Sequence, residues 1–406
     1  MTRGSAGPDP AGRRLGLFYG AYFALVGILA PYMPLYFENR GLTAVQIGLL
    51  IALGQAMRRV GPNLWGWLAD RADRRTRILH LTSFALVVSF ALLFFPGGFG
   101  FVFFAMVLVN FFQTAQMPVA EALASAQLRG QADAATRYGR LRVMGSLGFV
   151  AIVLAAGPLF DRVGMNAALW VCVALALLLL GTSFGVSEQQ SHELPHERIS
   201  VRARLREPRV RWFFLSAALM VFAHGAMYAY LSLYLAQLGY NKTAIGAFWV
   251  VSVVLEIAFF FTQGRWFARF GVFPLMTAAF AVAAVRFLLI AELATVWWVL
   301  VIAQAMHAVT FAVHHSASVL TIQRWFPGRA AARGQALYIS MAYGCGGTAG
   351  SLVAAWLWSA FGPEWAFIAG SVGAVFGGWA ALRMRRADRN REPHQVDLVV
   401  DRSVQG

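Results

Sequence analysis

The feature that most constrains this chain is a series of long apolar tracts that recur about every 30 residues. They cover residues 15–36, 44–65, 77–95, 98–120, 137–160, 165–186, 212–236, 244–262, 272–291, 295–322, 334–360 and 364–382. Each tract is close to the ~20 residues that an α-helix needs to cross the hydrocarbon layer. The tracts are continuous rather than alternating, which favours helices over a membrane β-barrel. The sequence therefore predicts an all-α polytopic membrane protein with twelve transmembrane helices.

The composition excludes a soluble fold and a nucleic-acid partner. Apolar residues make up 59% of the 406 residues and charged residues only 13%, against about 25% charged residues in ordinary globular chains. A net charge of +16 would by itself suggest nucleic-acid binding. The basic residues, however, lie mainly between the apolar tracts, so the lipid bilayer is the expected partner.

The basic residues also predict the orientation of the chain. Loops on the N-terminal side carry Arg71, Arg74, Arg75, Arg77, Arg129, Arg137, Arg265, Arg269, Arg324, Arg329 and Arg333. Loops on the opposite side carry only Arg40, Arg162 and Lys242. By the positive-inside rule both termini are cytoplasmic, as expected for a multi-pass protein of the bacterial inner (plasma) membrane.

A polar stretch at 187–211 divides the chain into two groups of six tracts. We expect a cytoplasmic N-terminal tail (1–14), a six-helix bundle (15–186), a cytoplasmic linker (187–211), a second six-helix bundle (212–384) and a disordered cytoplasmic tail (385–406). An internal repeat supports this division, because several residues recur at a constant offset of 198. Ile47-Gly48 matches Ile245-Gly246, and Gly66 matches Gly264. Two parallel halves predict a binding site between them, near the middle of the membrane.

The architecture and one loop resemble the major facilitator superfamily. The loop between the second and third tracts reads Gly66-Trp-Leu-Ala-Asp70-Arg71-Ala-Asp73-Arg74-Arg75, which is similar to the loop signature of that superfamily. Asp73 stands where the signature has glycine. The resemblance implies that Gly66, Asp70, Arg71 and Arg74 form a gate whose contacts change between access states.

A closer resemblance is to the proton-linked lactose permease and to the 3-phenylpropionate transporter group. It rests on Pro118-Val-Ala-Glu121-Ala and on Tyr138-Gly-Arg-Leu-Arg142-Val-Met-Gly145. It implies that Glu121 and Arg142 bind substrate, and that Glu256, Arg286 and His307 couple transport to protons. Thr310 stands where the permease has a glutamate, so its proton relay cannot be transferred whole.

The charges inside the tracts point to a site without help from the resemblance. They are Arg58, Arg59, Glu121, Arg142, Glu256 and Arg286, four cations against two anions. Each costs at least ~2.5 kcal/mol in the membrane, so each should face a cavity or a partner. The excess of positive charge suits a carboxylate substrate better than a neutral sugar.

Roles for these charges follow from their positions, with alternatives. Glu121 and Arg142 are assigned to the substrate, or else form a structural ion pair between successive helices. Arg58 and Arg59 point about 100° apart on a helix; at least one should face the cavity, and Arg59 is selected here. Glu256 is the expected proton carrier, with Glu121 as competitor. Arg286 is its expected counter-charge, and a permanent pair is the alternative.

Polar residues without charge complete the candidate site. Gln113 and Gln116 lie one turn apart and are expected to face the cavity, or else to bond between helices. His224 is expected to line the cavity, and His307 to take part in coupling or simply to pack. Neither the two cysteines nor the histidines have the spacing of metal ligands.

The function expected from these observations is proton-coupled symport of a small aromatic acid by a monomer. No catalytic or nucleotide-binding motif appears, so we expect no enzyme activity and no cofactor besides the coupling protons. An oligosaccharide or nucleoside symporter is the main alternative. Drug efflux and a receptor built on a transporter fold are further alternatives.

Overall fold

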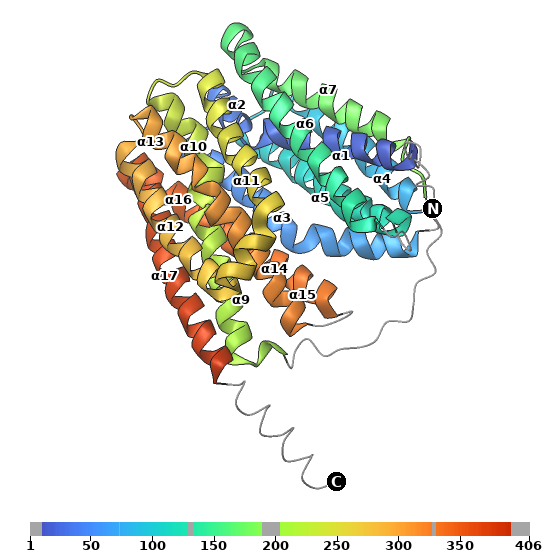
Figure 1. Ribbon diagram of the computed structural model, residues 1–406. Coiled ribbons are helices and arrows are strands. Elements are labelled where there is room, and N and C mark those ends of the chain that lie inside the picture. The colour runs from blue at the N-terminus through green and yellow to red at the C-terminus, as the bar shows by residue number, and fades with distance from the viewer. Residues whose placement is uncertain (1–9, 73, 129–132, 189–203, 327–329, 391–406) are drawn as a thin grey trace.

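A computed structural model describes residues 10–72, 74–128, 133–188, 204–326 and 330–390, and these residues form helices without strands (Figure 1). The first half contains α1 (Pro10–Leu29), α2 (Met33–Asn39), α3 (Ala44–Arg71), α4 (Arg75–Leu92), α5 (Phe99–Leu128), α6 (Ala134–Val163) and α7 (Ala167–Ser183). The second half contains α9 (Pro208–Ala223), α10 (Gly225–Gln237), α11 (Lys242–Phe270), α12 (Val272–Leu293), α13 (Trp297–Ala305), α14 (His314–Trp325), α15 (Ala330–Tyr338), α16 (Thr348–Phe361) and α17 (Pro363–Arg389). Two π-helices, η1 (Ala308–Val313) and η2 (Ile339–Gly347), interrupt the second half.

Every one of the predicted tracts coincides with a helix or with a run of consecutive helices. Eight helices of the described part are long and apolar enough to cross a membrane, and a ninth span is the pair α1 and α2, which is bent by 42°. Helix α7 is apolar but has only 17 residues. Helix α3 carries Arg58, Arg59 and Asn63 in its interior, so its polar residues require a protected environment.

Three predicted boundaries are wrong by a few residues. Helix α1 begins at Pro10, inside the predicted N-terminal tail, and α9 begins at Pro208, inside the predicted linker. Helix α17 continues to Arg389, because the buried carboxylate of Asp388 accepts a hydrogen bond of 2.7 Å from Arg209 at the start of α9. The rest of the predicted tails and linker, at 1–9, 189–203 and 391–406, lies outside the described residues.

The two halves form separate groups of helices that meet along α6 and α11, and along α3, η2 and α16. In Figure 1 the first half is blue to green and the second half yellow to red. We call the end of the molecule that contains α2 and the start of α11 the outer end, following the predicted orientation.

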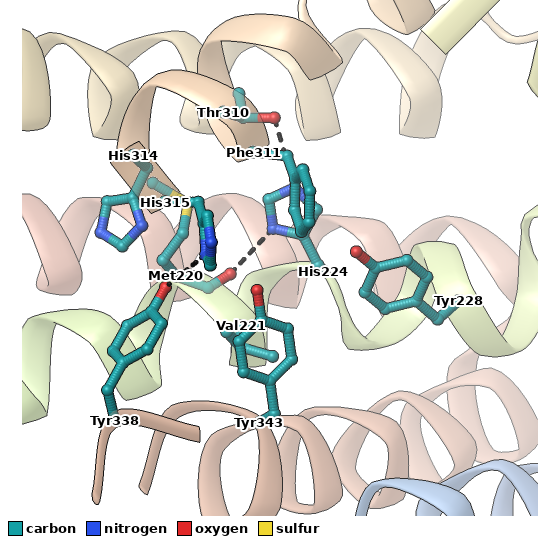
Figure 2. A pocket seen from close by; sticks show the side chains of 10 residues that line it. All are labelled: Met220, Val221, His224, Tyr228, Thr310, Phe311, His314, His315, Tyr338 and Tyr343. Atoms are coloured by element: carbon teal, nitrogen blue, oxygen red, sulfur yellow. Dashed lines mark hydrogen bonds between the residues drawn. The ribbon is translucent and has the colours of Figure 1, made fainter. Parts of the chain in front are cut away.

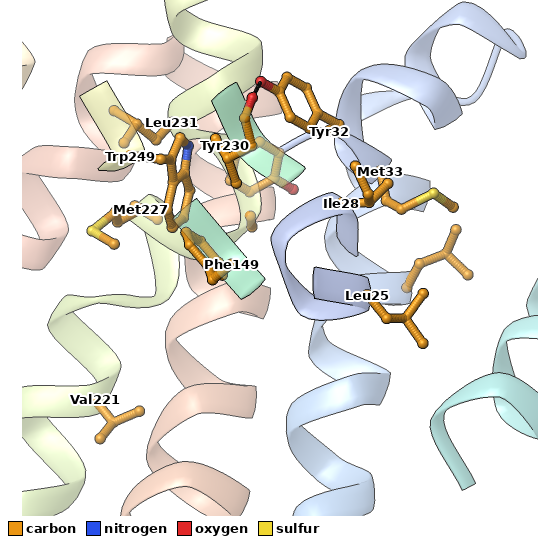
Figure 3. Close-up of a cluster of buried hydrophobic side chains, with 14 of the residues drawn as sticks. Leu25, Ile28, Tyr32, Met33, Phe149, Val221, Met227, Tyr230, Leu231 and Trp249 are labelled. Carbon is orange, nitrogen blue, oxygen red and sulfur yellow. Dashed lines mark hydrogen bonds between the residues drawn. The ribbon is translucent and has the colours of Figure 1, made fainter. Parts of the chain in front are cut away.

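Two tyrosines join the halves at the outer end. The Tyr32 hydroxyl donates to the carbonyls of Val153 (2.9 Å) and Lys242 (3.4 Å), and the Tyr230 hydroxyl donates to the Ala44 carbonyl (2.8 Å). Figure 3 shows both tyrosines in the buried apolar cluster between the halves.

Two glycines make these contacts possible. A Cβ at Gly246 would overlap the Tyr32 hydroxyl, and a Cβ at Gly48 would overlap the Tyr230 hydroxyl. Tyr32 and Tyr230 are 198 residues apart, as are Gly48 and Gly246. The repeat detected in the sequence therefore appears as a symmetric pair of contacts, which we call the outer seal.

Asp161 closes the outer end further. Its carboxylate, at the end of α6, accepts hydrogen bonds from the backbone N–H groups of Lys242 (2.8 Å) and Thr243 (2.9 Å) and from the Thr243 hydroxyl (2.6 Å). A carboxylate at a helix N-terminus satisfies unpaired donors and interacts favourably with the helix dipole. These contacts cross between the halves and hold them together at the outer end.

Candidate functional site

Glu121 on α5 and Arg142 on α6 lie together between the halves, as predicted. Arg142 Nη1 is 3.9 Å from Glu121 Oε1, and their side chains are 49% and 45% exposed. Arg142 also lies over the ring of Phe23, 5.6 Å from its centroid. Two charges this accessible within a membrane protein face water, and they can therefore meet a substrate.

Glu256 is not paired with Arg286, contrary to expectation. The described residues give the Glu256 carboxyl no ion pair or hydrogen bond, and the cation whose charge acts on it is Arg142. The reason is packing, because α11 lies against α6 of the other half. Arg142 thus pairs with Glu121 of its own half, and its electric field reaches Glu256 of the other.

Arg286 on α12 is fully buried and is surrounded by neutral groups. Its Nε donates to the Ala303 carbonyl (2.7 Å), its Nη1 to Thr310 Oγ1 (3.1 Å) and its Nη2 to Gln304 Oε1 (3.0 Å). Met227 Sδ accepts a further contact of 3.0 Å from Nη2. No carboxylate of the described residues forms an ion pair with it, so hydrogen bonds alone offset its burial.

His224 and His307 are held by the same guanidinium. Arg286 Nη1 lies 3.0 Å from His307 Nδ1 and 3.3 Å from His224 Nε2, while His224 Nδ1 lies 2.8 Å from the Met220 carbonyl. Because a guanidinium only donates, a ring nitrogen bonded to it must accept, and a ring that accepts is neutral. Nη1 has two hydrogens for these two rings and Thr310, and a guanidinium this close favours uncharged imidazoles.

A narrow pocket opens beside these histidines in the second half (Figure 2). It is lined by Met220, Val221, His224, Tyr228, Thr310, Phe311, His314, His315, Tyr338 and Tyr343. Phe311 stacks on His307 and on His315, with ring centroids 5.2 Å and 6.0 Å apart. His224 lines this pocket as part of the Arg286 cluster, and its predicted role in substrate binding stays a prediction.

Both π-helices contribute to this pocket. Thr310 and Phe311 belong to η1, and Tyr343 belongs to η2. Single π-turns inside α-helices are frequent at functional sites. The sequence analysis missed Tyr338 and Tyr343, and the only signal for η2 was the glycine run that begins at Gly344.

Arg58 lies against an aromatic side chain of the other half, and the selected Arg59 is exposed beside it, so the role of Arg59 stays a prediction. The Arg58 guanidinium lies over the Tyr343 ring, 5.5 Å from its centroid. Arg59 instead packs its backbone and Cβ against Gly344, where an added Cβ would lie 3.0 Å from Arg59 Cβ. Close packing of α3 on η2 therefore sets the Arg59 backbone against Gly344 and the Arg58 guanidinium over Tyr343.

Gln116 does not face a cavity, contrary to the prediction. It is fully buried, its Oε1 accepts from the Ser83 hydroxyl (3.0 Å), and its Nε2 donates to Thr82 Oγ1 (3.1 Å). The alternative of hydrogen bonding between helices therefore holds, here between α5 and α4. Gln113, one turn earlier, is half-buried, and its role stays a prediction.

The predicted gating loop is partly described. Gly66 lies within α3, Arg71 lies over the Trp67 ring at 4.0 Å, and Arg74 is exposed at the start of α4. The side chain of Asp70 and the whole of Asp73 lie outside the described part. The gate therefore stays a prediction.

A carboxylate that the sequence analysis did not single out binds beside this loop. Glu188 accepts hydrogen bonds from the backbone N–H groups of Arg75 (2.7 Å) and Thr76 (3.2 Å) at the N-terminus of α4. Like Asp161, it could not be recognised from the sequence, because the helix terminus that it caps is more than 80 residues away. Among the described residues no group of three His, Cys, Asp or Glu side chains could hold a metal ion.

Comparison with known proteins agrees with this geometry. A profile of the MFS_1 like family matches residues 13–369. A probable 3-phenylpropionic acid transporter of Escherichia coli K12 is 29% identical over 338 residues, covering 82% of this chain and 87% of that protein. The maltose permease of Geobacillus stearothermophilus is 28% identical over 287 residues, covering 70% and 72%.

Solved transporter structures share the fold at low identity. The nucleoside transporter NupG superposes with a TM-score of 0.80 at 15% identity, covering 92% of this chain and 98% of that chain. A proton dependent oligopeptide transporter superposes with a TM-score of 0.73 at 15% identity, covering 94% and 99%. At such identity the likeness describes the helix arrangement alone.

Proposed function

Because the chain belongs to the MFS_1 like family of membrane transporters rather than to an enzyme family, we propose that it carries a small aromatic carboxylic acid across the inner membrane together with protons. The observation that carries this proposal is the accessible Glu121–Arg142 pair between the halves. It lies where rotation of the two halves about each other would expose it to either side.

The charge balance supports an anionic substrate. The membrane interior holds Arg58, Arg59, Arg142 and Arg286 against Glu121 and Glu256. An anion offsets the excess positive charge, whereas a neutral sugar or nucleoside does not. The similarity to a probable 3-phenylpropionic acid transporter points in the same direction.

The position of Arg142 supports proton coupling. Its guanidinium interacts with Glu121 of its own half and with Glu256 of the other. Protonation of Glu256 removes one of these electrostatic interactions, while Glu121 continues to position the guanidinium. In the proposed cycle, a proton on Glu256 or Glu121 and a bound substrate together permit the halves to reorient. No other cofactor is required, and a monomer contains the whole site.

The proposal also includes the orientation. Both termini lie on the cytoplasmic side, so closed contacts at the outer end and an accessible site describe an inward-facing conformation. Glu256 is the proposed main proton carrier, because it faces Arg142 without a hydrogen bond to the described residues. Arg286 and His307 hold the surrounding cluster in place.

Proteoliposomes containing the purified protein and an external pH indicator test the proposal. Addition of 3-phenylpropionate should alkalinise the external medium as protons enter with the substrate, whereas empty liposomes should not respond. Maltose and nucleosides in the same assay separate the aromatic acid from the alternative substrates. Uptake of maltose or a nucleoside, with no response to aromatic acids, would contradict the substrate assignment; uptake without alkalinisation would contradict proton coupling.

A further inference from the structure

Arg58 is an accessible cation inside the membrane that lacks an anionic partner among the described residues. Its side chain is exposed, and the described part of the chain gives it no hydrogen bond or ion pair. Its one direct contact is the Tyr343 ring, 5.5 Å away. By helix rise, Arg58 lies roughly 21 Å along α3 from the outer end, well inside a ~30 Å hydrocarbon layer.

The close packing of α3 on η2 fixes the position of Arg58. Helix α3 packs closely on η2, since an added Cβ at Gly347 would lie 3.2 Å from the Gln55 side chain and one at Gly344 would lie 3.0 Å from Arg59. At this contact the Arg59 Cβ lies against Gly344, and the neighbouring Arg58 guanidinium lies over Tyr343. The orientation of Arg58 is therefore a property of the interface between the halves.

The Arg58 guanidinium lies over the Tyr343 ring, and its electric field reaches two further tyrosines, one from each half. Its charge acts on Tyr22 of α1, Tyr228 of α10 and Tyr343 of η2. The charge of Glu256 acts on Tyr228 and Tyr343 as well. A ligand bound to Arg58 would meet its guanidinium and the Tyr343 ring, beside the narrow pocket that Tyr228 and Tyr343 line.

Two other cations of the interior are already engaged. Arg142 lies 3.9 Å from Glu121, and Arg286 is buried with its nitrogens bonded to neutral acceptors. A guanidinium binds a carboxylate through two parallel hydrogen bonds and holds it more firmly than an ammonium group does. Arg58 therefore has the free geometry that a carboxylate ligand requires.

We propose that Arg58 binds the carboxylate of the substrate, with the Tyr343 ring beside it, and so makes the protein select acids over their neutral analogues. This inference deepens the proposed function and depends on it. It assigns a role to Arg58 that is separate from the Glu121–Arg142 pair. The Tyr343 ring then holds the guanidinium in place before the anion arrives.

Direct binding to purified full-length protein tests the proposal. Affinities for 3-phenylpropionate and for its neutral amide, 3-phenylpropanamide, are measured with wild type and with Arg58→Gln, Arg58→Lys and Arg59→Gln. Arg58→Gln should weaken binding of the acid roughly 10- to 100-fold, the effect of losing a charge-assisted hydrogen bond. Its affinity for the amide should change less than about threefold, and Arg58→Lys should recover part of the loss.

The binding results separate a role of Arg58 in anchoring the carboxylate from a general effect of the substitution on the site. Equal losses for acid and amide in Arg58→Gln, or a loss in Arg59→Gln as large as in Arg58→Gln, would overturn the anchoring role. So would unchanged binding of the acid by Arg58→Gln. Wild-type protein that binds neither 3-phenylpropionate nor any other acid of a monocarboxylate panel would overturn the proposed function, and the inference with it.

Discussion

Glu121 and Arg142 form an ion pair that water reaches, so each charge remains available to a ligand. We expect Glu121→Gln to abolish substrate binding, because Arg142 loses the partner that positions its guanidinium. Since hydrogen bonds to charged groups contribute about 1.5–3 kcal/mol, the loss should be at least roughly tenfold. Isothermal titration or scintillation proximity with radiolabelled acid measures it.

The matched control is Asp133→Asn, which removes an exposed carboxylate paired with Arg137 at the start of α6. This surface pair should contribute little to stability or binding. Normal transport by Glu121→Gln would show that the pair fastens α5 to α6 and does not hold substrate.

Glu256 faces Arg142 from the other half and has no hydrogen bond to the described residues. If it carries the proton, Glu256→Gln mimics the protonated state permanently. We expect counterflow exchange of substrate to continue and accumulation driven by a pH gradient to be lost. Comparison of the two assays in proteoliposomes checks this, and accumulation at the wild-type level would exclude Glu256 as the carrier.

The sequence predicted which residue types lie in the site better than it predicted their partners. Membrane burial of a charge requires a reason, so Glu121, Arg142, Glu256 and Arg286 were recognisable from their positions alone. How Arg58 and Arg59 lie against η2 depends on how closely η2 approaches α3 at Gly344. Such packing between distant segments leaves no signal in one sequence.

At the scale of helices, polar residues inside the membrane divide between site and scaffold. Gln116 links α5 to Thr82 and Ser83 of α4. We expect Gln116→Leu to destabilise the protein by about 1–3 kcal/mol, because two buried hydroxyl groups lose a partner. Substrate affinity should stay within about threefold of wild type, since this cluster does not reach the site. Thermal unfolding in detergent and ligand binding measure the two effects.

Gln113→Leu, one turn earlier on α5, is the matched variant. No hydrogen bond of its side chain to the described residues is lost, so its melting temperature should stay near that of wild type. A stable Gln116→Leu protein with lost binding would instead restore Gln116 to the substrate site.

Helix positions were predictable because the bilayer demands about 20 apolar residues per span. The sequence did not predict the π-turns of η1 and η2 or the helix break at His224. These features depend on contacts between distant segments, such as those of Arg286. The expected partner of Arg286 was a carboxylate, on the principle that buried charges are paired. The structure satisfies the same principle with carbonyl, amide, hydroxyl and imidazole acceptors.

At the scale of the whole molecule, the outer seal determines which side the site faces. A tryptophan at Gly48 or Gly246 would occupy the space of the Tyr230 or Tyr32 hydroxyl. We expect the double variant Gly48→Trp, Gly246→Trp to hold the outer end open. Gly181→Trp is the control, because an added Cβ there meets nothing within 4 Å.

Spin labels report the opening directly. Exposed positions Glu38 on α2 and Gln237 on α10 carry the labels, in a background without Cys172 and Cys345. The distance distribution should lengthen in the double variant and stay unchanged in Gly181→Trp. An unchanged distribution in the double variant would show that the seal does not control access.

The outer seal also bears on how such a chain can arise. Tyr32 of the first half meets Gly246 of the second, and Tyr230 of the second meets Gly48 of the first. This reciprocity is the contact pattern of an isologous two-fold dimer, in which one tyrosine and one glycine per subunit generate both contacts. A six-helix ancestor with that single pair would close its outer end by dimerising. Gene duplication and fusion would then preserve the closure, while Asp161, opposite Ser359 in the repeat, marks where the two copies have since diverged.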